Sequence, residues 1–126
     1  MTRVLVVEDN AAVRELVGMY LKKAGLVVAM AGNGDEALAA VASRGSPDVA
    51  ILDIEMPGMN GMELLTKLRE MPGMDALPAI FLSARVESKD IEAGIDMGAS
   101  YLTKPFIGSA LINLVRKVVV PAGGEW

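Results

Sequence analysis

Five polar residues stand out because each follows a short apolar run and because their side chains suit one chemistry. Glu8 and Asp9 follow the first apolar run of the chain, and Asp53 follows a later one. Ser83 and Lys104 come after two further runs. In open α/β sheets, ligands bind outside the carboxyl ends of the strands, so these side chains are expected to converge there.

The residue types in this set favour metal-assisted phosphoryl chemistry. Neighbouring carboxylates repel one another unless a cation compensates, and Mg²⁺ prefers carboxylate and water oxygens, often together with phosphate. Glu8, Asp9 and Asp53 carry −3, which Lys104 reduces to −2 and Mg²⁺ would neutralise. A carboxylate beside Mg²⁺ can attack phosphorus and form an aspartyl phosphate, whose oxygens Lys104 and Ser83 could hold. A single Asp at a strand end is usually a cap or turn residue, so the joint placement carries this argument.

Alternating apolar and amphipathic segments provide the elements that would position these residues. Continuous apolar runs predict buried strands over residues 4–7, 26–31, 49–52, 79–82 and 101–103. Apolar residues at helical spacing predict helices over residues 11–24, 35–44, 62–70, 88–97 and from 107 or 109 to 119. Asn10 is expected to cap the first helix and Gly25 to end it. This alternation predicts an α/β fold with one parallel sheet and helices on both faces.

The composition excludes several other classes of protein. The 126 residues fit one domain and contain no Cys and no His, which excludes disulfides, Cys-type zinc sites and His-dependent hydrolases. The net charge of −4 and the pI of about 4.8 do not support nucleic-acid binding. No apolar run approaches the ~18 residues of a membrane span, and the first run is too short for a signal peptide. A cytoplasmic location is therefore expected.

Four motifs resemble those of the receiver domain of two-component response regulators. They occupy residues 6–10 (VVEDN), 52–61 (LDIEMPGMNG), 82–84 (LSA) and 101–106 (YLTKPF), in the family's order and spacing. The resemblance covers residues 2 to about 119. It implies a flavodoxin-like, doubly wound five-stranded parallel sheet of order 2-1-3-4-5 with five helices. It also implies a receiver domain over residues 1–120, followed by a C-terminal tail or the start of a linker over residues 121–126.

The resemblance also implies a metal site and a phosphoacceptor. Asp53 would be the phosphoacceptor. Asp9, Asp53 and the backbone carbonyl of Glu55 would ligate Mg²⁺, for which Mn²⁺ can substitute. Glu8, which stands where most members have Asp, would support the metal through water.

Further residues would connect the phosphoryl group to a surface. By the same resemblance, Lys104 would contact the phosphoryl group and Ser83 would move to hydrogen-bond it. Tyr101 would swing inward behind Ser83, coupling the site to the surface of the fourth helix, fifth strand and fifth helix. The Lys104–Pro105 peptide bond is cis in the family.

Two charged residues lie where family members tune hydrolysis. Glu55 and Arg85 stand two residues after Asp53 and Ser83, respectively. As an opposite-charge pair they would screen the phosphoryl group and slow autodephosphorylation. The alternative is that both are simply solvated side chains.

The leading hypothesis is a phosphorylation-activated switch that catalyses only its own phosphorylation and dephosphorylation. Because the sequence has no His, the phosphohistidine donor would be a sensor histidine kinase or a histidine phosphotransfer protein. The output would be another protein or a missing effector domain, and the chain would be a monomer or a phosphorylation-dependent dimer. One alternative is an aspartyl-phosphate phosphohydrolase, although such enzymes have a second Asp where this chain has Glu55. The other is a constitutive interaction module that is never phosphorylated.

Overall fold

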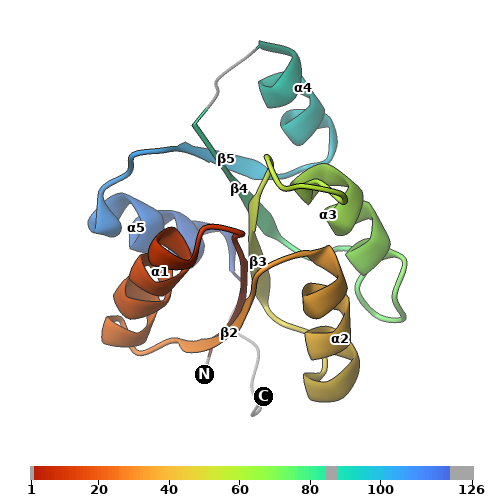
Figure 1. Ribbon diagram of the computed structural model, residues 1–126, viewed down its shortest axis with the longest axis horizontal. Coiled ribbons are helices and arrows are strands. Elements are labelled where there is room, and N and C mark those ends of the chain that lie inside the picture. Colours follow the sequence, from red (N-terminus) through yellow and green to blue (C-terminus); the bar gives the residue numbers. More distant parts are fainter. Residues whose placement is uncertain (1, 85–87, 120–126) are drawn as a thin grey trace.

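The protein is built around a parallel sheet that lies between two layers of helices (Figure 1). This computed structural model describes residues 2–84 and 88–119. Within them the strands follow the order β2-β1-β3-β4-β5 and all neighbouring strands are parallel. The strands are β1 (Arg3–Val7), β2 (Val27–Ala31), β3 (Val49–Asp53), β4 (Ala79–Ser83) and β5 (Ser100–Thr103). The flavodoxin-like order predicted from the sequence is confirmed.

The helices divide between the two faces of this sheet. They are α1 (Ala11–Lys23), α2 (Gly34–Arg44), α3 (Gly61–Arg69), α4 (Ser88–Asp96) and α5 (Gly108–Val118). Figure 1 shows α1 and α5 together on one side of the strands, with α2 and α3 on the other and α4 beyond β5. Each helix connects two parallel strands or follows the last one, as a doubly wound fold requires.

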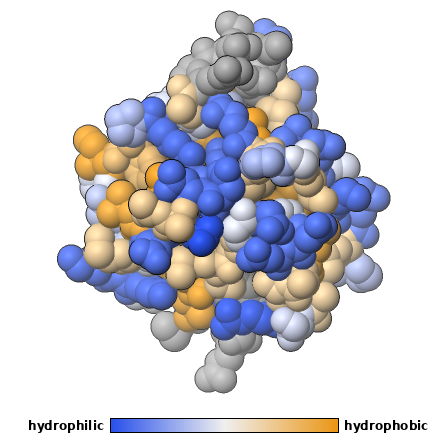
Figure 2. Space-filling model, in the orientation of Figure 1, coloured by the Kyte–Doolittle hydropathy of each residue, from blue (hydrophilic) through white to orange (hydrophobic). Residues whose placement is uncertain are grey.

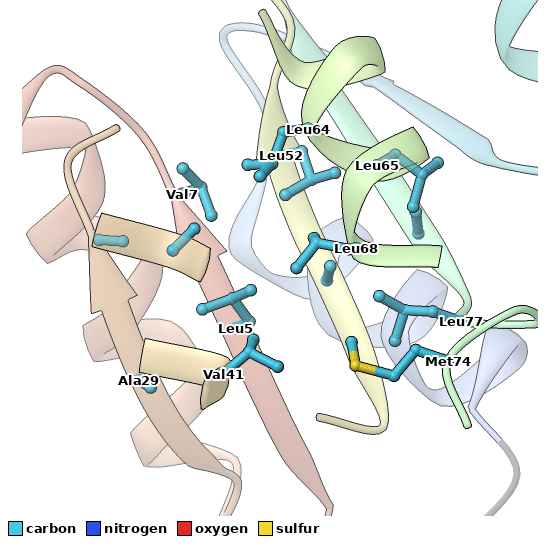
Figure 3. Packing of buried hydrophobic residues seen from close by; sticks show 14 of the residues in the cluster. Leu5, Val7, Ala29, Val41, Leu52, Leu64, Leu65, Leu68, Met74 and Leu77 are labelled. Carbon is cyan, nitrogen blue, oxygen red and sulfur yellow. The ribbon is translucent and has the colours of Figure 1, made fainter. Parts of the chain in front are cut away.

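Alternating strand residues supply two apolar cores because successive side chains point to opposite faces of a sheet. Leu5 and Leu52 contribute to the core beneath α2 and α3, whose packing Figure 3 shows. Val6 and Ile51 contribute to the core beneath α1 and α5. Burying one such side chain completely stabilises the fold by about 1.5–3 kcal/mol relative to leaving it exposed. These two cores hold the central strands, and therefore their carboxyl ends, in place.

The observed boundaries agree with the predicted ones to within one or two residues. Asn10 caps α1 by accepting a hydrogen bond from the backbone N–H of Val13 at 3.1 Å, as predicted. Gly25 follows α1 with a φ of 84°, a left-handed conformation that favours glycine and ends the helix. The last helix begins at Gly108, between its two predicted starts.

The remaining expectations from the sequence concern one peptide bond, membrane spans, Arg85 and the C-terminal residues. The Lys104–Pro105 bond is cis. In the part of the chain that the structure describes, no helix is both long and apolar enough to cross a membrane. Arg85 and the predicted tail, residues 121–126, lie outside the described residues. The division into residues 1–120 and 121–126 therefore stays a prediction.

Candidate functional site

The register of the sheet brings the predicted site residues to one edge. Val7 pairs with Leu52 across β1 and β3, so Glu8, which follows β1, and Asp53, the last residue of β3, stand side by side. Across β4 and β5, Ser83 pairs with Thr103, the residue before Lys104. In the orientation that Figures 1 and 2 share, hydrophilic residues form a band across the middle of the visible face, where the loops after β1 and β3 lie.

Three carboxylates form a cluster at this edge. One oxygen from each of Glu8, Asp9 and Asp53 lies within 4.8 Å of the other two. Glu8 is buried and Asp53 is 2% exposed, whereas Asp9 is exposed to solvent. Buried carboxylates are costly unless they are paired. Lys104 supplies part of this pairing: its Nζ forms a salt bridge with Glu8 and lies 3.4 Å from Oδ1 of Asp53.

The cluster changes the proton affinity of its members. Burial raises the pKa of Asp53 to about 7, and hydrogen bonding to Glu8 and Asp9 acts in the same direction. Burial also acts to raise the pKa of Asp9, but hydrogen bonding to Asp53 and Glu8 lowers it overall. For Lys104, burial acts to lower the pKa, but the bond to Glu8 and the charge of Asp53 raise it. Without a cation, Asp53 therefore stays protonated up to a higher pH than an ordinary Asp does.

The donor set fits a hard divalent cation. Carboxylate oxygens are preferred ligands of Mg²⁺, and the −3 of the cluster exceeds the single positive charge of Lys104. A bound cation would favour the ionised form of Asp53, which is the form that can act as a nucleophile. The residues present therefore suit the metal that the sequence predicted.

Backbone contacts fix the carboxylates in this arrangement. The N–H of Asn10 donates to Oε2 of Glu8 at 3.2 Å, and the N–H of Glu55 donates to Oδ1 of Asp53 at 3.2 Å. A Cβ at Gly61 would overlap the carbonyl oxygen of Asp53, so glycine allows α3 to begin directly against the end of β3.

The positioning roles of two residues, Arg14 and Gly61, were not predicted from the sequence. Arg14 donates from Nη1 to the backbone carbonyl of Glu8 at 2.7 Å and so ties α1 to the end of β1. Its position one turn after Asn10, the residue that caps α1, was the available signal. Gly61 could have been recognised as the glycine after Asn60, whose side chain forms a capping box with Glu63.

The hydroxyl and the aromatic ring of the predicted switch lie on the same face of the sheet. Ser83 and Phe81 alternate with Leu82, so they share one face, and Phe81 pairs with Tyr101. The two rings lie 6.2 Å apart between centroids at 58°. A Cβ at Gly94 of α4 would come within 3.3 Å of the Tyr101 ring. Tyr101 therefore lies between β4 and α4, half-buried.

Ser83 has a close partner that was not predicted. Its hydroxyl donates to Oε1 of Glu55 at 2.5 Å. Arg85, the predicted partner of Glu55, lies outside the described residues, so that pairing stays a prediction.

The sheet has the flavodoxin-like strand order, and its acidic cluster and lysine lie at the carboxyl edge, where ligands bind in doubly wound folds. Residues 4–116 match the family model of the response regulator receiver domain. The chain therefore belongs to the response regulator receiver family of two-component systems.

Individual relatives agree with this assignment. The transcriptional regulatory protein CseB of Streptomyces avermitilis is 37% identical over 119 residues, which cover 94% of this chain and 49% of CseB. The DNA-binding response regulator MtrA of Mycobacterium tuberculosis is 36% identical over 115 residues, which cover 90% of this chain and 49% of MtrA. The chain thus spans about half the length of these curated relatives.

The fold is also similar to that of a solved structure. The chemotaxis protein CheY4 of Vibrio cholerae matches with a TM-score of 0.88 and 32% sequence identity, covering 94% of this chain and 99% of that one. The sequence similarity and the fold therefore support the same family.

Proposed function

We propose that this receiver domain accepts a phosphoryl group on Asp53 from the phosphohistidine of a sensor histidine kinase or a histidine phosphotransfer protein. The observation that carries the proposal is the position of Asp53, which joins the acidic cluster to Lys104 at the carboxyl edge of the sheet. The sequence contains no His, so the donor histidine lies outside it.

In the proposed reaction, a carboxylate oxygen of Asp53 attacks the phosphorus of the donor. The new O–P bond forms as the N–P bond breaks, and the electron pair of that bond returns to the imidazole nitrogen. Lys104 holds a phosphoryl oxygen by a charge-assisted hydrogen bond. Asp9, Asp53 and the backbone carbonyl of Glu55 would hold Mg²⁺, with Glu8 supporting it, and the bound ion would neutralise part of the phosphoryl charge. Mn²⁺ can take the same place.

Phosphorylation would then change the surface near β5. In this proposal, Ser83 hydrogen-bonds the phosphoryl group and Tyr101 moves inward behind it. Tyr101 contacts both β4 and α4, which supports its role as the connection to the surface of α4, β5 and α5. An output protein, or an effector domain in a longer chain, would bind the phosphorylated surface more tightly, and a phosphorylation-dependent dimer could use the same surface.

Glu55 and Arg85 are proposed to lengthen the life of the phosphoryl group. Both stand two residues beyond a proposed phosphoryl contact, where a side chain can obstruct the attacking water. Replacement of either residue by Ala is expected to speed the loss of phosphate. Unchanged lifetimes in both variants would remove this part of the proposal.

The proposal and its alternatives differ in stoichiometry. With phosphoramidate and Mg²⁺, a receiver takes up one phosphoryl group per chain and releases only that group. A phosphohydrolase would consume many equivalents of a phosphate ester, and a constitutive module would take up none.

Intact-mass spectrometry should therefore reveal one added phosphoryl group, absent when EDTA replaces Mg²⁺ and absent in Asp53→Asn. Asp35→Asn, on the exposed start of α2, is the matched control and should be modified normally. Persistent modification of Asp53→Asn would contradict the proposal.

A further inference from the structure

We propose that Glu55 is a positioning residue that holds the Ser83 hydroxyl before phosphorylation by standing in for a phosphoryl oxygen. Ser83 would then have to exchange acceptors when Asp53 is phosphorylated. This inference rests on the proposed function, because it concerns how the same site switches. It adds a residue that opposes switching in the unmodified chain.

The contact joins two segments that lie far apart in the sequence. Oγ of Ser83, at the end of β4, is 2.5 Å from Oε1 of Glu55, which belongs to the loop after β3. Ser83 is 1% exposed, whereas Glu55 is exposed to solvent. A flexible surface carboxylate thus reaches back to a buried hydroxyl.

Both residues are held by their backbones, so their side chains carry the change. The N–H of Glu55 donates to Oδ1 of Asp53, which keeps the loop beside the proposed phosphoacceptor. The carbonyl of Ser83 accepts a 2.8 Å hydrogen bond from the N–H of Lys104, which fixes the end of β4 against β5. The proposed exchange therefore involves rotation of the Ser83 hydroxyl and withdrawal of the Glu55 side chain.

The chemistry of a hydroxyl makes the two acceptors exclusive. A serine hydroxyl carries one proton and donates one hydrogen bond. A carboxylate oxygen and a phosphoryl oxygen are both anionic acceptors of such a bond. Ser83 therefore donates either to Glu55 or to the phosphoryl group. Because Glu55 is exposed, water can satisfy its carboxylate after the exchange, which keeps the exchange reversible.

Simple charge repulsion is the competing explanation for any effect of Glu55. A carboxylate near Asp53 also repels an incoming anion, whether or not it touches Ser83. The two explanations differ in their dependence on the hydroxyl. Competition for the hydroxyl vanishes when Ser83 is replaced by Ala, whereas repulsion persists.

A double-mutant cycle separates the two explanations. Four proteins are compared: the unmodified chain, Glu55→Ala, Ser83→Ala and the double variant. The affinity of each for beryllofluoride, a phosphoryl analogue, is measured by ¹⁹F NMR at saturating Mg²⁺. Glu55→Ala is expected to tighten binding about tenfold when Ser83 is present, since hydrogen bonds to charged groups have this order of strength. In the Ser83→Ala background the same change is expected to alter binding by less than about twofold.

Two further variants serve as controls. Glu55→Gln keeps an acceptor oxygen without the charge, so it should remain closer to the unmodified chain than to Glu55→Ala. Glu15→Ala removes an exposed acid from α1 and should leave the affinity unchanged.

Each remaining outcome has a definite meaning. The inference would be overturned if Glu55→Ala changed the affinity for beryllofluoride by the same factor with and without Ser83. It would also be overturned if Glu55→Gln changed this affinity as much as Glu55→Ala does. Either result would leave the proposed function standing. Failure of the unmodified chain to bind beryllofluoride would overturn the proposed function, and the inference with it.

Discussion

Strands β3 and β5 both carry residues of the candidate site, but they are held very differently. All five residues of β3 are buried, and the strand lies between β1 and β4. In β5, three residues are half-buried and Thr103 is exposed; among the described strands it pairs with β4 alone. Asp53 is the last residue of β3, whereas Tyr101 lies in β5 and Lys104 follows β5.

Under the proposed function, this difference would separate phosphoryl transfer at Asp53 from the surface change near β5. A buried central strand holds Asp53 at a fixed position relative to Glu8, which a phosphoryl transfer requires. A half-exposed edge strand loses less apolar burial when it shifts, so movement there is less costly. Tyr101, between Phe81 and α4, stands where such a shift would reach the surface.

Equivalent truncations in the two strands should differ in their effect on stability. Leu52→Ala in β3 is expected to lower the free energy of unfolding by about 3–5 kcal/mol, because it leaves a cavity in a fully buried core. Leu102→Ala in β5 should cost about 1–2 kcal/mol, because that side chain is half-buried. Urea unfolding followed by circular dichroism measures both. Equal losses would remove the contrast between the strands.

The lysine that follows β5 should matter for the affinity of the site for a phosphoryl analogue. Lys104→Ala removes the ammonium group that pairs with Glu8 and Asp53. Binding of beryllofluoride with Mg²⁺ is expected to weaken about 10- to 100-fold, the usual range for a lost hydrogen bond to a charged group. Lys117→Ala, an exposed change in α5, is the control and should bind normally. An unaltered affinity in Lys104→Ala would mean that this lysine does not contact the phosphoryl group.

The raised pKa of Asp53 should appear in the pH dependence of stability. In the folded, metal-free protein this pKa is about 7, against 3.8 for an ordinary Asp. Between these values the folded state binds a proton that the unfolded state lacks, so the free energy of unfolding falls as pH rises. After allowance for solvent screening, we expect this contribution to fall by about 1–2 kcal/mol from pH ~5 to pH ~8.

The Asn variant isolates this contribution from that of other carboxylates. The free energy of unfolding of the unmodified chain and of Asp53→Asn is measured in urea with EDTA. Between pH ~5 and pH ~8, that of the unmodified chain should fall by about 1–2 kcal/mol more than that of Asp53→Asn. Parallel curves would show that Asp53 does not titrate in this range.

The aromatic ring of β5 should have the smallest effect on the chemistry itself. Tyr101→Leu keeps an apolar side chain between Phe81 and α4, so the affinity for beryllofluoride should change by less than about twofold. What should change is the response of α4, seen as a smaller amide shift of Gly94 in NMR spectra when beryllofluoride binds. A full-sized response in Tyr101→Leu would assign the coupling to another residue.

Much of the fold was predictable because its strands have an unambiguous pattern. In β3 and β4 both faces are buried, which produces continuous apolar runs that end in Asp53 and Ser83. The strand ends then placed the acidic cluster and Lys104 together, since the carboxyl ends of parallel strands share one edge.

The side-chain partners were not predictable because they depend on segments distant in the sequence. Arg69, at the end of α3, donates from Nη2 to the carbonyl of Leu77 at 2.9 Å and from Nη1 to that of Met97. The bond from Ser83 to Glu55 likewise requires the loop after β3 to lie against the end of β4. Periodicity locates elements, but it contains no information about such contacts.

The most direct test of the account is hydrogen exchange of the whole chain with and without beryllofluoride and Mg²⁺. A phosphoryl analogue on Asp53 should leave the amides of β3 unchanged while altering exchange in β5 and in the described part of α4. The same comparison in Asp53→Asn should reveal no change in either strand. A change in exchange confined to β3, or an equal change in Asp53→Asn, would contradict the central claim. That claim is that a phosphoryl group on Asp53 of β3 alters the structure at β5.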